Sequence, residues 1–196
     1  IEYGKKPRDL YDAEVTYTDQ IVGKLLDFIG SQSWAKETAI FVTADHGEGF
    51  GEHGKFFHGF ELWEELIRVP LLVSLPGVKP RVITTPRSHI DLAPTILELM
   101  GAKKAASMRG ASLVSEIYGA DAEEREVVTD LPVTSDNDAR RAVVFHGKKV
   151  IRFGAVGTRV FDLAADSGEK TPLQGPARDE MNTVMKRVDE SIRFVP

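Results

Sequence analysis

The sequence predicts an α/β fold, in which a layered sheet is flanked by helices and followed by a small antiparallel β subdomain with a C-terminal helix. Two observations predict it. Over residues 1–119, apolar residues at helical spacing alternate with short, almost continuous apolar runs, which is typical of helices packed on a sheet. Over residues 120–196, short β-rich runs surround turn residues and precede a final helical pattern. We therefore place a domain boundary between residues 119 and 120.

The first half of the chain begins with an expected helix and two expected strands. Apolar residues spaced three and four apart predict an amphipathic helix over Asp9–Ile29, ended by Gly30. The run 39–44 is nearly all apolar, which predicts a strand buried on both faces, as in parallel sheets. The run 69–75 predicts a second such strand, closed by a Pro-Gly pair.

Three further elements complete the expected α/β part. A glycine-rich loop after the first strand passes into a short acidic helix near Glu61–Ile67. Arg81–Thr85 predicts another strand. Asp91 is expected to be the N-cap of a helix over Leu92–Met100, because aspartate is favoured at that position.

The second half predicts a hairpin, a third strand and a helix. Arg141–Phe145 and Lys149–Phe153 flank the turn residues His146-Gly147 and predict two paired strands. Thr158–Leu163 predicts a third strand. Asp179–Phe194 predicts the terminal helix, with an apolar face. The residues expected on that face are Met181, Val184, Met185 and Val188.

Composition excludes several classes of function. The 196 residues include 25 Lys and Arg, 30 Asp and Glu and no Cys, for a net charge of −5. The charge argues against non-specific nucleic-acid binding, and the lack of Cys excludes disulfides and a thiol nucleophile within these residues. No apolar run approaches the roughly 18 residues of a membrane span. The chain opens on Ile1 without an initiator Met or a signal stretch, so we expect a piece of a longer protein.

The loop over residues 43–59 concentrates the chemistry. It holds three of the five histidines, three carboxylates and five glycines. Asp45 directly follows an expected strand, and ligands of α/β sheets bind beyond the carboxyl ends of strands. Asp45 and His46 together offer one oxygen and one imidazole nitrogen, a pair suited to a divalent metal.

Structural interpretations compete with the functional ones. Asp45 could form a turn by capping backbone N–H groups. His53 and His58 could be exposed loop residues. We expect structural roles for His89 and His146, because neither has a chemical partner nearby in the sequence.

Two acidic stretches are also expected to be structural. Glu64 and Glu65 are expected on a solvated helix face. The acidic residues Asp162, Asp166 and Glu169 are expected to form a polar turn rather than a calcium loop.

Five segments, in order along the chain, strongly resemble the sulfatase family of the alkaline phosphatase superfamily. The loop segment reads Phe-Val-Thr-Ala-Asp-His-Gly-Glu-Gly-Phe-Gly-Glu-His-Gly, and the next one contains Arg-Val-Pro-Leu-Leu-Val. The segments are 11–26, 41–54, 62–77, 88–101 and 160–173. The resemblance implies that residues 1–119 are the C-terminal part of the sulfatase core and carry half of its metal site.

The family implies a reaction and a division of roles. Its members hydrolyse sulfate esters with one divalent metal, usually Ca²⁺, and with a formylglycine made from Cys or Ser. By resemblance, Asp45 and His46 are two metal ligands, with Zn²⁺ or Mn²⁺ as alternatives to Ca²⁺. The Cys-x-Pro-x-Arg or Ser-x-Pro-x-Arg nucleophile motif occurs nowhere in the sequence. We therefore expect a fragment with little activity alone.

One position departs from many sulfatases. Thirteen residues after Asp45, where many members place a Lys, this sequence has His58. A His there is typical of phosphoethanolamine transferases, which use zinc and a Thr nucleophile. We expect His58 to contact sulfate or phosphate oxygens and to donate a proton to the leaving group. Lys55 could supply the cation instead, and His53 is a further candidate for substrate binding.

The predicted function is therefore that of a sulfuric ester hydrolase acting on a small-molecule or saccharide sulfate. One alternative is a phosphoethanolamine or phosphoglycerol transferase or a phosphodiesterase of the same superfamily, and a second is a non-catalytic fragment. No nucleic-acid partner is expected, and an oligomer is possible. The resemblance favours the periplasm or the extracellular space.

Overall fold

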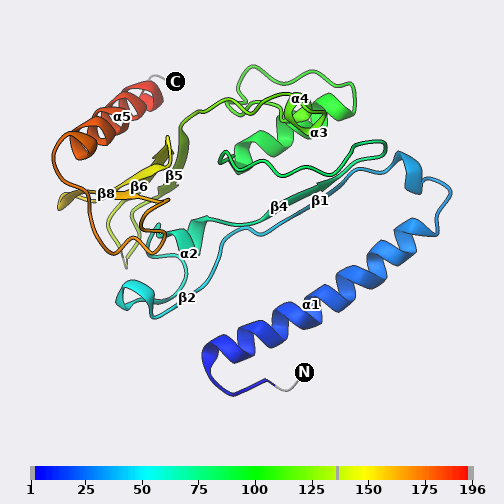
Figure 1. Cartoon of the computed structure of the whole chain (residues 1–196), viewed down its shortest axis with the longest axis horizontal. Coiled ribbons are helices and arrows are strands. Elements are labelled where there is room, and N and C mark those ends of the chain that lie inside the picture. Colours follow the sequence, from blue (N-terminus) through cyan, green and yellow to red (C-terminus); the bar gives the residue numbers. More distant parts are fainter. Residues whose placement is uncertain (1–2, 136, 194–196) are drawn as a thin grey trace. The chain divides into compact units, whose positions relative to one another are not determined.

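The computed structural model describes residues 3–135 and 137–193, and these fold into two compact units (Figure 1). We call the first the loop unit; it contains the chain up to His58 together with Arg68–Val78. The second, the sheet unit, contains Gly59–Ile67 and the chain from Lys79 onward. The predicted boundary between residues 119 and 120 stays a prediction.

The loop unit begins with helix α1, Pro7–Gly30, close to the predicted range. Proline suits the first helical position, because its missing N–H has no partner there in any helix. The backbone N–H of Lys6 donates to Asp9 Oδ2 at 3.0 Å, and the helix ends where Ser31 N donates to Asp27 O at 3.1 Å. A short 3₁₀ turn, Ala35–Glu37, follows. None of the residues of α1 is buried.

The two predicted strands of this unit form, but their setting differs from the prediction. Strand β1, Ile40–Thr43, pairs antiparallel with β4, Leu71–Ser74, and these two strands make a separate sheet. The expectation of a parallel strand buried on both faces is wrong for this chain, since Val42 and Leu72 are exposed. An apolar run predicts that a strand can be buried, but it specifies neither the direction of its neighbour nor what covers it.

The sheet unit is built on four antiparallel strands in the order β5-β6-β7-β8. They are Val127–Leu131, Arg140–Phe145, Lys148–Phe153 and Gly157–Asp162. The predicted hairpin and third strand are confirmed, whereas β5 was not predicted. His146 and Gly147 have φ of 48° and 69°, the two positive values that the tightest hairpin turn requires.

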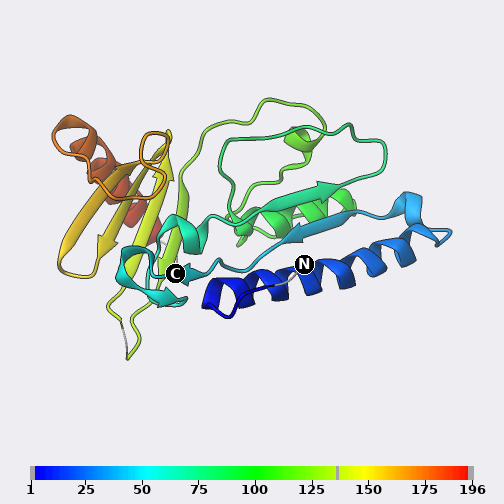
Figure 2. The same ribbon diagram turned by 60° about the horizontal axis from the view of Figure 1, so that its bottom comes forward.

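Both faces of this sheet are covered, one of them by a helix that is visible in Figures 1 and 2. Helix α5, Pro176–Arg193, lies across one face, and its predicted apolar residues are confirmed as part of a buried cluster. Phe194, the predicted end of the helix, lies outside the described residues. Leu62 and Trp63 cover the other face, where Trp63 contacts the rings of Phe153 and Phe161. The buried cluster under α5 consists of Val143, Val150, Val160, Met181, Val184, Met185 and Val188.

Three short helices complete the sheet unit: α2, α3 and α4. They are Glu64–Ile67, Leu92–Leu99 and Val114–Ile117, with a 3₁₀ turn over His89–Asp91. Within the described part of the chain, every helix is too short or too polar to cross a bilayer.

Two predictions for this region are wrong in detail. Arg81–Thr85 is not a strand; the guanidinium of Arg81 donates instead to the carbonyls of Glu116 and Ala120, at 2.8 and 3.1 Å. Asp91 stands at the N-cap position of α3, as predicted, but its carboxylate makes no capping hydrogen bond with that helix.

The carboxylate of Asp91 has three partners, all of them outside α3. It accepts from Ser88 N at 3.1 Å and from Ala111 N at 2.8 Å, and it pairs with Arg125 Nη2 at 2.8 Å. Long-range partners of a buried carboxylate therefore outweigh the local preference for an N-cap.

A buried charge cluster holds α2 on the sheet. Lys149 Nζ lies 3.0 Å from Glu64 Oε1 and 2.9 Å from Glu169 Oε1, and Glu64 N donates to Glu169 Oε2 at 2.6 Å. Burial raises the pKa of Glu169, and the Lys149 ammonium and the N–H of Glu64 offset part of that rise. The prediction that Glu64 is solvated is wrong, because its partner lies 85 residues away and is invisible to local patterns.

The predicted polar turn after β8 is observed for Asp162 and Asp166, whereas Glu169 is buried against Lys149. Asp162 Oδ1 accepts from the N–H groups of Ala164 and Ala165, both at 3.0 Å, and Asp166 Oδ2 accepts from Thr171 N at 2.7 Å. These carboxylates therefore bind backbone, which is the ordinary role of Asp in turns.

Candidate functional site

The loop over residues 43–59, which holds the candidate site residues, contains a small hairpin. Strands β2, Gly49–Phe50, and β3, Phe56–Phe57, pair antiparallel with Gly49 opposite Phe57. Gly51 N donates to Lys55 O at 2.9 Å across the turn, and Gly51 has a φ of 109°, which favours glycine. A 3₁₀ turn, Glu52–Gly54, forms the tip.

The start of α1 contacts this hairpin. The rings of Tyr11 and Phe50 meet edge to face with centroids 5.3 Å apart, and the Arg8 guanidinium lies 5.4 Å from the Phe50 centroid. Arg8 also approaches Glu52 at 3.9 Å. Hydrogen bonds from the backbone N–H groups of Glu52 and Phe50 lower the pKa of the Glu52 carboxyl. The start of α1 therefore helps to hold the hairpin within the loop unit.

Asp45 and His46 lie just beyond the end of β1. Asp45 Oδ1 accepts from His46 N at 3.0 Å, which is the contact that the turn interpretation predicts. Its other oxygen, Oδ2, lies 3.7 Å from His46 Nε2, and the side chain is 90% exposed. His46 Nδ1 lies 2.8 Å from Gly47 O. Since a carbonyl can only accept, Nδ1 carries the proton, and the Nε2 of the neutral ring holds a lone pair.

Asp45 and His46 together supply part of the ligand set that a divalent cation needs. A carboxylate oxygen and an imidazole lone pair face the same space, and both are acceptors, so a cation between them would satisfy both. Among residues 3–135 and 137–193, no group of three or more His, Cys, Asp or Glu side chains is arranged to hold a metal. The loop therefore presents two ligands, whereas Ca²⁺ takes about 6–8 oxygens.

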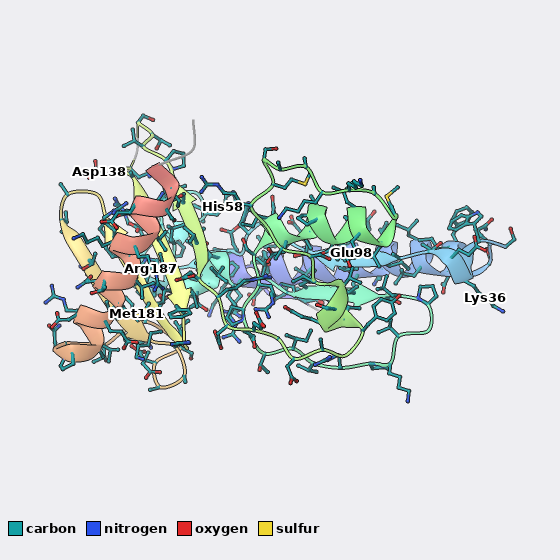
Figure 3. All side chains as sticks on the ribbon, turned by 90° about the horizontal axis from the view of Figure 1, so that it is seen from above. Lys36, His58, Glu98, Asp138, Met181 and Arg187 are labelled. Atoms are coloured by element: carbon teal, nitrogen blue, oxygen red, sulfur yellow. The ribbon has the colours of Figure 1, made fainter. Side chains whose placement is uncertain are left out.

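His58 lies beside this pair. His58, labelled in Figure 3, directly follows β3, and its ring stacks on that of His46 with centroids 4.0 Å apart and planes 30° apart. His58 Nδ1 lies 3.0 Å from Glu48 Oε2. The fold thus brings together His46 and His58, which are twelve positions apart in the sequence.

The other two predicted site residues belong to the far end of the hairpin. His53 lies in the tip with a φ of 53°, and Lys55 is exposed just before β3. Their predicted contacts with substrate stay predictions.

The two remaining histidines occupy turns. His146 forms the β6–β7 turn and stacks on Phe145 with ring centroids 3.8 Å apart. His89 opens the 3₁₀ turn before α3. His146 thus has the structural role expected for it, and the structural role expected for His89 stays a prediction.

Glu48 is a member of the site that was not predicted from the sequence. The sequence contained one indication of this pair, because Glu48 and His58 lie at equal distances along the chain on either side of the glycine-rich turn. Finding the pair required the register of the hairpin, and strands of two residues carry no usable alternation.

Comparison with known proteins places the loop and α1 in a family. Residues 3–102 match the family described as Sulfatase. A choline-sulfatase of Rhizobium meliloti (strain 1021) is 31% identical over 173 residues, covering 86% of this chain and 33% of that protein. The chain thus spans about one third of the length of this curated relative.

Solved structures share the fold. One, determined in complex with its substrate D-glucosamine-2-N,6-O-disulfate, has a TM-score of 0.77 at 23% identity, over 91% of this chain and 39% of that one. A phosphonate monoester hydrolase of Agrobacterium radiobacter has a TM-score of 0.76 at 18% identity, over 95% of this chain and 40% of that one. These similarities confirm the predicted fold class.

Proposed function

Since this chain belongs to the sulfatase family, we propose that it supplies part of the active site of a metal-dependent hydrolase of sulfate esters. The observation that carries the proposal is the gathering of Asp45, His46 and His58 at the base of one hairpin. The nucleophile, a formylglycine made from Cys or Ser, would come from outside these residues, because its motif is absent from the sequence.

Asp45 Oδ2 and His46 Nε2 would be two ligands of a divalent cation. A bound cation supplies charge neutralisation at the sulfate oxygens and keeps the nucleophile deprotonated. Ca²⁺ is our first choice because carboxylate oxygen is a hard ligand, and Zn²⁺ or Mn²⁺ would suit the imidazole nitrogen.

His58 would act on the ester itself. Its Nδ1 is taken by Glu48, so Nε2 is the atom left to contact a sulfate oxygen. As the S–O bond breaks, His58 in its imidazolium form, which carries a proton on both nitrogens, would pass the Nε2 proton to the leaving oxygen as a general acid and remain as the neutral ring with its proton on Nδ1. Lys55 and His53 would contribute further contacts with the sulfate.

The proposed substrate is a small-molecule or saccharide sulfate ester. Support comes from the choline-sulfatase relative and from the structure bound to a disulfated glucosamine. We propose a periplasmic or extracellular location on the family resemblance.

A second candidate is a phosphotransferase or phosphodiesterase of the same superfamily. Two observations favour it: the structural similarity to a phosphonate monoester hydrolase, and a His at position 58 where many sulfatases have Lys.

The test compares two esters. The natural polypeptide that contains this sequence is assayed on 4-nitrophenyl sulfate and on bis(4-nitrophenyl) phosphate. Faster cleavage of the sulfate is expected, and cleavage of the phosphodiester alone would overturn the sulfatase proposal. Asp45→Asn should reduce turnover by at least tenfold and weaken Ca²⁺ binding in calorimetry, whereas Asp27→Asn, on the exposed side of α1, should change neither.

The 196-residue chain alone is a further test. It should show little turnover of 4-nitrophenyl sulfate, since it offers two metal ligands and lacks the nucleophile motif. Robust turnover would contradict the proposed division of the site.

A further inference from the structure

We propose that Glu48 is the positioning residue of His58: it holds the proton of the neutral ring on Nδ1 and so dedicates Nε2 to the substrate. The hydrogen bond between Glu48 and His58 depends only on the fold of the hairpin. Its catalytic meaning rests on the proposed function.

The register of the hairpin creates this pair. Gly49 lies opposite Phe57 in the β2–β3 ladder, so the next position outward on each strand is Glu48 and His58. Residues directly opposite one another on antiparallel strands have side chains close enough to interact. The 3.0 Å contact between Glu48 Oε2 and His58 Nδ1 is the result.

The chemistry of the pair determines the tautomer. An ionised carboxylate only accepts hydrogen bonds, so the ring nitrogen that faces it must donate. A neutral imidazole has one N–H, and the atom that is not engaged keeps the lone pair. With Nδ1 as the donor, Nε2 of His58 is the acceptor, the same arrangement that Gly47 O imposes on His46.

The surroundings of Glu48 make the contact specific. Its side chain is only 18% exposed, whereas that of Asp45 is 90% exposed. Glu48 Oε1 is buried and has no hydrogen-bond partner among the described residues, so His58 is the partner that compensates this carboxylate. The stacked ring of His46 limits rotation of His58 out of the contact.

The two restraints act on different degrees of freedom. The stack on His46 restrains the plane of the His58 ring, and the hydrogen bond restrains its rotation about the ring normal. A carboxylate that holds a functional imidazole in one orientation is a recurrent device of catalytic and metal sites.

The tautomer can be measured without any substrate. The ¹⁵N-labelled chain is examined by long-range ¹H–¹⁵N correlation spectra at pH 8.5, an alkaline pH at which free histidine is neutral. The His58 signals are assigned by their loss in His58→Gln. We expect the Nδ1–H tautomer in the wild type and a shift to Nε2–H, the commoner form of free histidine, in Glu48→Ala.

Two further variants separate this contact from damage to the hairpin. Glu48→Gln should retain the Nδ1–H tautomer, because its amide oxygen still accepts. Glu52→Ala, which removes another hairpin carboxylate, should leave the His58 spectrum unchanged. An Nε2–H wild type, an unchanged Glu48→Ala spectrum, or the same shift in Glu52→Ala would overturn the proposal.

Kinetics test the catalytic meaning. In the natural polypeptide on 4-nitrophenyl sulfate, Glu48→Ala should lower kcat on the order of tenfold or more with KM nearly unchanged, and Glu48→Gln should recover part of the loss. A kcat equal to that of the wild type would overturn the catalytic role. Because the tautomer is read without substrate, a wild type that cleaves no sulfate ester would count against the proposed function and not against the Glu48–His58 pair.

Discussion

The two units differ in whether the apolar face of their long helix is buried. Helix α5 in the sheet unit buries its apolar stripe, and Met181 has no exposed surface. Helix α1 in the loop unit also carries an apolar stripe, yet Ile21 is 45% exposed and Leu25 is 55% exposed. The periodicity of a helix therefore predicts its apolar face but not whether anything in the same chain covers it.

The candidate site belongs to the unit with the uncovered surface. The loop unit contains exposed apolar residues on α1, β1 and β4, and apolar patches of this kind mark surfaces that contact further protein. The sheet unit, in contrast, has a sheet packed on both faces and a buried ion cluster. We expect stability to come mainly from the sheet unit and chemistry from the loop unit.

Removing the buried lysine should have the largest effect. Lys149→Met leaves two acidic partners, Glu64 and Glu169, without their cation, which typically costs about 3–5 kcal/mol. Lys148→Met is the matched control, because Lys148 is partly exposed and lies 3.7 Å from Glu180; it should cost less than about 1 kcal/mol. Urea unfolding followed by tryptophan fluorescence measures both, and equal losses would refute a buried charge cluster in the sheet unit.

Truncating one residue in each helix tests the comparison directly. Met181→Ala should lower the free energy of unfolding by about 3 kcal/mol, since it leaves a cavity under α5. Ile21→Ala on α1 should cost less than about 1 kcal/mol, because little of its burial is lost. If chemical unfolding gave Ile21→Ala the larger loss, the view that α1 is uncovered would be wrong.

A smaller effect should depend on pH. Burial would raise the pKa of Asp189, but hydrogen bonds from Arg152 and Arg141 outweigh it and lower the pKa. The stability from Asp189 is therefore present above its unfolded pKa of 3.8 and lost as pH falls through the lower folded value. Asp189→Asn should cost about 1–2 kcal/mol at pH 7, and the difference from the wild type should shrink below that unfolded pKa.

Glu52 in the loop unit provides the control for this experiment. Its pKa is also lowered, by backbone hydrogen bonds, so its contribution has the same sign and is lost on acidification. Its side chain is largely solvated, so Glu52→Gln should change the pH dependence less than Asp189→Asn does. A larger pH-dependent change for Glu52→Gln would reverse the ranking of the two units.

Much of the fold was predictable from local patterns. The range of α1, the apolar face of α5 and the turn at His146-Gly147 all follow from spacing and turn chemistry. Strand β5 was missed and a strand over Arg81–Thr85 was wrongly expected, because a short run becomes a strand only if a neighbour pairs with it.

The candidate site, like the fold, was predictable in part from the sequence. Asp45 and His46 are adjacent and follow a strand, so sequence alone brought them together. That His58 stacks on His46 depends on the hairpin turning back, and that Glu48 binds His58 depends on its register. Neither distance is contained in the spacing of the residues.

The sequence by itself determined which residues can do chemistry and which faces are apolar, because these properties belong to side chains and their periodicity. Only the tertiary structure decided which partners they have. Glu64 was predicted to be solvated and is instead bound to a buried lysine. Asp91 occupies the predicted N-cap position, but its carboxylate binds Arg125 instead of the helix. The physical reason is the same in both: the free energy of a buried charge depends on groups that are distant in sequence and brought near only by the fold.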